Sequence, residues 1–134
     1  MEQKELREKY LELQMLDQQM KEVQKQIQMI NERLSELQYV DASLDDFKGS
    51  KLGSEILVPI SPGIYAKAEL KDNSSLIVNV GANTAVKKSV DESKLLLNSQ
   101  KIEIEGIRSQ LIQQLEQFDG KARKLEQQIM ENSQ

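Results

Sequence analysis

The sequence predicts an α+β chain in which two β-hairpins join the arms of a long antiparallel α-helical coiled coil. Within residues 1–48 and 90–132, apolar side chains recur at alternating spacings of three and four, which is the pattern of a coiled coil. Residues 54–89 hold both prolines, none of the sixteen glutamines, and short runs with the two-residue period of β-strands. We expect a single domain over residues 1–134.

Composition excludes several classes of function. The chain of 134 residues is 38% hydrophobic and 30% charged, with a net charge of -4 and no basic block, so nucleic acid is not an expected partner. It contains no His or Cys, which removes Ser-His and Cys-His nucleophiles and the usual zinc sites. No glycine-rich phosphate loop is present. We expect neither an enzyme nor a cofactor.

The same composition bears on location. The first residues are charged and no long apolar run occurs, so we expect no signal peptide and no membrane partner. The absence of cysteine fits a reducing compartment, and we expect a cytoplasmic chain.

The first arm carries five heptads. The coiled-coil seam, meaning the stripe of side chains that faces the partner helix, is predicted from two interleaved series. These are Leu6, Leu13, Met20, Ile27 and Leu34, and Lys9, Leu16, Val23, Ile30 and Leu37, of which only Lys9 is not apolar.

Beyond Leu37 the apolar stripe continues through Val40 and Leu44 but loses one residue of the heptad spacing. Either the helix runs on to Phe47 and stops at Gly49, or it breaks near residues 41–43 and restarts. We expect the first, with helix over residues 1–48.

Four short runs follow, over residues 55–60, 64–70, 76–80 and 84–88, separated by turn sequences such as Ser61-Pro62-Gly63. Two hairpins with apolar faces are too small to be stable alone, and the helical arms have seams of their own. We therefore expect other subunits to complete the sheet. The predicted assembly residues are Ile56, Val58, Ile64, Ala66, Leu76, Val78 and Val80.

The second arm begins with the order of a capping box, Ser89 followed three residues later by Glu92, and is expected to span residues 90–132. Gly106 and Gly120 interrupt it at a cost of about 1 kcal/mol each. Its seam residues are Leu97, Ile104, Leu111, Phe118 and Leu125, and Lys101, Arg108, Leu115, Ala122 and Ile129.

Antiparallel arms bring the two ends of the chain to one tip. Adaptable apolar residues there could contact other polypeptides. For Leu13 and Leu125 the seam explains the apolar character, whereas Tyr10 and Met130 lie off it. The candidate contact residues at the tip are Leu6, Tyr10, Leu13, Leu125, Ile129 and Met130.

The middle of the chain resembles the α-class subunit of prefoldin (GimC). The resemblance is carried by residues 54–60 (SEILVPI), 63–68 (GIYAKA), 76–82 (LIVNVGA) and 86–92 (VKKSVDE), with Ser93 as a departure where alanine is expected. Two hairpins rather than one indicate the α class.

The resemblance implies a hexamer of two α-class and four β-class subunits whose hairpins form an oligomeric β-barrel. It also implies an ATP-independent chaperone, or holdase, that binds unfolded client polypeptides at the coiled-coil tips and delivers them to a group II chaperonin. The alternative is a structural coiled-coil scaffold or a filament-forming paralogue.

Overall fold

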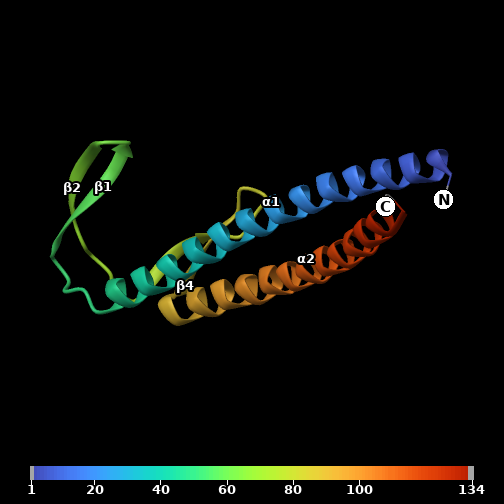
Figure 1. Cartoon of the computed structure of the whole chain (residues 1–134). Helices are drawn as coiled ribbons and strands as arrows, with labels where there is room; N and C mark the ends of the chain where they lie inside the picture. The colour runs from blue at the N-terminus through green and yellow to red at the C-terminus, as the bar shows by residue number, and fades with distance from the viewer. Residues whose placement is uncertain (1, 133–134) are drawn as a thin grey trace. The chain divides into compact units, whose positions relative to one another are not determined.

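The computed structural model describes residues 2–132 as two long helices with four strands between them (Figure 1). Helix α1 spans Gln3–Lys48 and helix α2 spans Val90–Asn132. The strands are β1 (Glu55–Ser61), β2 (Ile64–Glu69), β3 (Ser75–Asn79) and β4 (Ala85–Ser89). They form two separate antiparallel hairpins, β1-β2 and β3-β4, so the predicted α+β fold class is confirmed.

Helix α1 is continuous to Lys48 and does not break near residues 41–43. It ends where Gly49 donates its amide to the carbonyl of Asp45 (3.1 Å) and Ser50 donates to the carbonyl of Phe47 (3.1 Å). These bonds satisfy carbonyl groups that the end of a helix leaves without partners.

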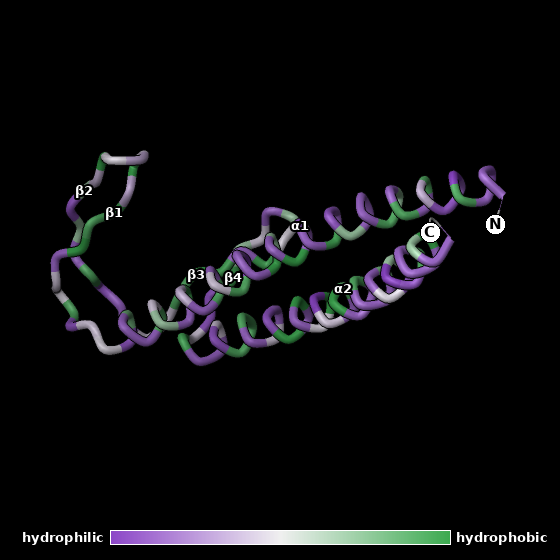
Figure 2. The backbone as a smooth tube through the Cα atoms, viewed as in Figure 1, coloured by the Kyte–Doolittle hydropathy of each residue, from purple (hydrophilic) through white to green (hydrophobic). Residues whose placement is uncertain are grey.

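The chain divides into two compact units. The helical unit contains residues 3–34 of α1 and 102–132 of α2. The hairpin unit is Ser35–Lys101, and contains the remaining turns of both helices with all four strands. Green hydrophobic positions recur along both helices among purple hydrophilic ones, as expected for helices that bury one stripe (Figure 2).

The core of the helical unit lies between antiparallel stretches of the helices. Leu16, Ala122 and Leu125 are buried together, and Leu13, Met20 and Phe118 pack against them. Lys9 donates to the Gln128 side chain, and Arg108 donates to that of Asn31 (2.9 Å). Every position of both predicted seams, the polar ones included, is buried or half-buried in the structure.

The hairpin unit has regular strand registers. In the first hairpin Ile56 lies opposite Ala68 and Val58 opposite Ala66, with an irregularity between Pro59 and Ser61. In the second, Leu76 lies opposite Lys88 and Val78 opposite Val86. Alternation along the strands therefore gives each hairpin one predominantly apolar face.

The second hairpin is partly covered by the helices of its own unit. A groove of about 340 Å³ is lined by β3, by Val40 and Leu44 of α1, and by residues 93–100 of α2. Leu76 and Val78 are half-buried there. The helical arms, which were expected to be occupied by their own seams, therefore also cover part of this hairpin. The loss of heptad spacing after Leu37 explains why, because Val40 and Leu44 face β3.

Candidate interaction surfaces

The six predicted tip residues divide by exposure. Leu125 and Ile129 are 8% and 7% exposed, so they belong to the core between the helices, and Leu6 and Leu13 are half-buried. Tyr10 and Met130 are 50% and 65% exposed. Among these six residues, the exposed side chains are therefore those of Tyr10 and Met130.

Two further residues near the same end of α1 are apolar and exposed. Leu11 and Met15 of α1 are both exposed and lie four residues apart, on neighbouring turns of one helix face. They were not predicted from the sequence because they lie off the seam, and the pattern that indicates them is an apolar pair spaced four residues apart. We call Tyr10, Leu11, Met15 and Met130 the end surface.

The first hairpin carries an uncovered apolar face. Strand register places Ile56, Val58, Ile64 and Ala66 on one side. Ile56, Val58 and Ile64 are exposed, and every residue of β1 is exposed. A two-stranded hairpin with such a face is marginal in water, so this face requires a partner.

The predicted assembly residues of the second hairpin have a different environment. Leu76 and Val78 are half-buried, whereas Val80 is exposed. On the opposite face Ile77, which is not among the predicted assembly residues, is 73% exposed. The uncovered apolar surface of the hairpin unit is therefore found mainly on the first hairpin.

Ion pairs join the two helices beside the hairpins. Lys48 lies 3.0 Å from Asp91, and Lys94 lies 2.5 Å from Asp45 and 3.9 Å from Asp41. The hydrogen bond to Asp45, with the nearby charge of Asp41, raises the pKa of Lys94. These groups are solvated, so the pairs orient the helices more than they stabilise them.

The turn between β2 and β3 is organised by Asp72. Its carboxylate accepts hydrogen bonds from the hydroxyl of Ser75 and from the amide and hydroxyl of Ser74. The Ser75 and Ser74 bonds hold the pKa of Asp72 well below its usual range. Asn73 donates to the carbonyl of Ser50 (2.8 Å), which ties the turn to the segment after α1.

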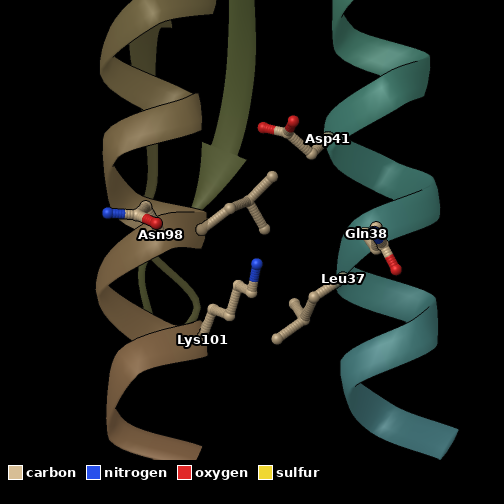
Figure 3. Close-up of a pocket in the computed structure, with 6 residues that line it drawn as sticks. Leu37, Gln38, Asp41, Asn98 and Lys101 are labelled. Atoms are coloured by element: carbon tan, nitrogen blue, oxygen red, sulfur yellow. The ribbon is translucent and has the colours of Figure 1, made fainter. Parts of the chain in front are cut away.

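A cavity of about 180 Å³ lies between the helices of the hairpin unit, lined by Leu37, Gln38, Asp41, Leu97, Asn98 and Lys101 (Figure 3). It offers one carboxylate and one ammonium group beside leucine side chains. Across residues 2–132 no acidic cluster could hold a metal ion, and no helix is long and apolar enough to cross a membrane.

The fold and these surfaces define a class of protein: a chain of two long helices and two β-hairpins that exposes apolar side chains in both of its units. A sequence model of the family described as "Prefoldin subunit" matches residues 16–134. The chain belongs to the prefoldin family and is of the archaeal alpha type. This is a family of chaperone subunits and not of enzymes.

Individual relatives agree with this assignment. The chain is 30% identical to prefoldin subunit alpha of Thermofilum pendens over 118 residues, covering 88% of this chain and 92% of the relative. It is 34% identical to prefoldin subunit alpha 1 of Thermococcus kodakarensis over 90 residues, covering 67% and 62% of the two chains.

The fold also matches a solved structure. A chain in the cryo-EM structure of filamentous PFD from Methanocaldococcus jannaschii superposes with a TM-score of 0.77 at 18% identity. The match covers 84% of this chain and 93% of that one. This likeness establishes the shared fold.

Proposed function

We propose that this chain is the alpha subunit of an ATP-independent holdase that binds unfolded polypeptides at the ends of its helical arms. The observation that carries the proposal is the end surface. Tyr10, Leu11, Met15 and Met130 present apolar and adaptable side chains to solvent, in a chain of a chaperone family. Several weak contacts made at once give useful affinity through effective concentration.

The proposal includes the partners that the family resemblance implies. Two copies of this chain join four β-class subunits through the hairpins, and the complex passes its clients to a group II chaperonin in the cytoplasm. The exposed apolar face of the first hairpin supports assembly, because its burial would stabilise the complex by roughly 25 cal/mol per Å².

Removal of the chain ends tests client binding. A complex whose alpha chain lacks residues 1–12 and 124–134 should retain its mass by light scattering but no longer suppress the aggregation of a denatured client. Unchanged suppression by a truncated complex of normal mass would exclude client binding at Tyr10, Leu11 and Met130.

A filament is the second candidate, favoured by the fold shared with a filamentous chain. Electron microscopy of the chain alone, and after addition of a β-class subunit, separates the two. Small discrete particles whose mass changes when the β-class subunit is added support the holdase. Long filaments that are unchanged by the added subunit support a scaffold.

A further inference from the structure

All the sulfur in this chain is in methionine. The sequence has five methionines, no cysteine and no tryptophan, so the thioether is the side chain that a two-electron oxidant attacks first. Of the four methionines that the structure describes, Met15, Met29 and Met130 are 62%, 61% and 65% exposed. Met20 is half-buried and packs against the core of the helical unit. Exposure therefore predicts rapid oxidation at three sites and slow oxidation at the fourth.

Two of the three exposed methionines, Met15 and Met130, belong to the end surface. Their unbranched thioether side chains adapt to many apolar partners. A methionine sulfoxide in the same place is polar and chiral, and its oxygen accepts hydrogen bonds. Burial of that oxygen against an apolar segment, without a hydrogen-bond donor, is unfavourable. Oxidation of these two residues therefore weakens the contacts that the end surface offers to an unfolded polypeptide.

The same oxidation leaves the fold intact. The side chains of Met15 and Met130 are exposed to solvent, so their sulfoxide oxygens stay hydrated in the folded chain. The buried cluster of the helical unit consists of leucine and alanine side chains, which peroxide does not oxidise. Binding and stability therefore respond differently to an oxidant.

We propose that Met15 and Met130 form an oxidation site, and that a peroxide acting there weakens client binding at the end surface. This inference deepens the proposed function and rests on it. It names a covalent modification, the two residues that receive it and the property that it changes.

The chemistry of the site is a two-electron oxygen transfer. The sulfur lone pair attacks one oxygen of the peroxide, and an S–O bond forms as the O–O bond breaks. The departing hydroxide takes the proton from the oxygen now bound to sulfur and leaves as water. Sulfur loses two electrons and the peroxide gains them. In the reverse direction two thiols reduce the sulfoxide and yield the thioether, a disulfide and water, which is the reaction of methionine sulfoxide reductases.

Met29 supplies a matched control on the same helix. It lies fourteen residues after Met15, which is two complete heptads, so it occupies the same heptad position about 21 Å farther along α1. The two side chains have nearly equal exposure, so peroxide should oxidise them at similar rates. Because Met29 is not part of the end surface, its oxidation should leave client binding unchanged.

Peroxide treatment of the full-length chain, followed by assembly with an untreated β-class subunit, confines oxidation to this chain. Catalase removes the peroxide before assembly, and peptide mass spectrometry measures the sulfoxide at each methionine. Complexes of equal mass are then titrated against a fluorescently labelled denatured client, and anisotropy reports the affinity. We expect the wild-type chain to lose about tenfold in client affinity once Met15 and Met130 are oxidised.

Leucine variants locate the effect, because leucine keeps the apolar volume and has no sulfur. Each variant is compared with its own untreated sample. Met15→Leu combined with Met130→Leu should lose less than about twofold in affinity on treatment, whereas Met29→Leu should lose about tenfold, as the wild type does. If the double variant binds no client before treatment, the two single variants replace it, and each should lose about threefold.

Reduction of the oxidised wild-type chain by a methionine sulfoxide reductase with dithiothreitol should restore its affinity. An equal loss in the double variant and the wild type, or binding that survives complete oxidation of Met15 and Met130, would overturn the oxidation site and leave the holdase intact. Absence of client binding before treatment would overturn the holdase and the oxidation site together. A fall of more than about 4 °C in the melting temperature on treatment would show that oxidation acts on the fold, which would contradict the proposal.

Discussion

The hydroxyl oxygen of Ser89 lies 3.0 Å from the backbone nitrogen of Glu92, so the last residue of β4 is also the N-cap of α2. Ser93 in turn donates its hydroxyl to the carbonyl of Ser89 (2.9 Å). No loop separates the second hairpin from the second arm, and the direction of β4 is fixed by the first turn of the helix.

Replacement of Ser89 by alanine should lower the free energy of unfolding by about 1 kcal/mol, because an amide of the first helical turn loses its acceptor. Ser89→Asp, which keeps an acceptor, should be close to wild type. Ser109→Ala, on an exposed face of α2, is the control. Thermal unfolding monitored by circular dichroism measures all three, and equal stability of Ser89→Ala and wild type would contradict the cap.

A matched pair of leucines tests the core of the helical unit. Leu16 is 6% exposed within the buried cluster, and Leu11 on the same helix is 55% exposed. We expect Leu16→Ala to cost about 2–5 kcal/mol in denaturant unfolding, since it removes buried methyl groups and leaves a cavity. Leu11→Ala should change stability by less than about 0.5 kcal/mol. Similar costs at both sites would contradict the predicted seam.

The interior glycines of α2 offer a gain in stability. A Cβ at Gly106 or Gly120 would meet no heavy atom within 4 Å, so alanine fits at both sites. Each substitution should raise the free energy of unfolding by about 0.5–1 kcal/mol, and the two effects should add.

Gly63 is the contrasting control for this prediction. It also has open space around it, but its φ of +83° disfavours a side chain. Gly63→Ala should therefore destabilise the chain by about 1 kcal/mol. A loss of stability at Gly106 or Gly120 would mean that the helix requires these glycines.

Asp72 should make the hairpin unit sensitive to acid. Its pKa in the folded chain is held below the ordinary value of 3.8 by hydrogen bonds from Ser75 and Ser74. The carboxylate thus stabilises the folded state above pH 3.8, and this contribution is lost as the pH falls toward the lower folded pKa.

Asp72→Asn should flatten this acid dependence of the melting temperature, measured between about pH 5 and pH 2. Asp17→Asn, an exposed change on α1, serves as the control and should keep the wild-type slope. An acid dependence unchanged in Asp72→Asn would show that the turn does not rely on the ionised carboxylate.

Much of this fold can be predicted from local pattern. The heptad of Leu6 to Leu37 and the capping order at Ser89 determine the helices, because seam spacing and cap chemistry act over a few residues. Strand positions were predicted to within a residue or two, since alternation and the turn at Gly63 bound them.

The environment of the hairpins could not be predicted in the same way. Val40 and Leu44 appeared only as an irregular continuation of the stripe, and their contact with β3 depends on distant parts of the chain. At the chain ends, apolar character alone placed both Met130 and Ile129 among the candidate contact residues. Their seam positions separate them, because Ile129 lies in the seam and is buried, whereas Met130 lies off the seam and is exposed.

The function proposed for this chain depends most on client binding at the end surface. A complex assembled with Tyr10→Ser and Met130→Ser in the alpha chain should suppress client aggregation at least about fivefold less well, because each change removes roughly 1 kcal/mol of apolar contact. The control is Met29→Ser, which alters a methionine that is 61% exposed on α1, away from the chain ends.

Light scattering of an aggregating client, measured with complexes of equal mass, makes the comparison. We predict wild-type suppression with Met29→Ser and a loss of suppression with the Tyr10 and Met130 variant. Full suppression by that variant, or an equal loss with Met29→Ser, would contradict it.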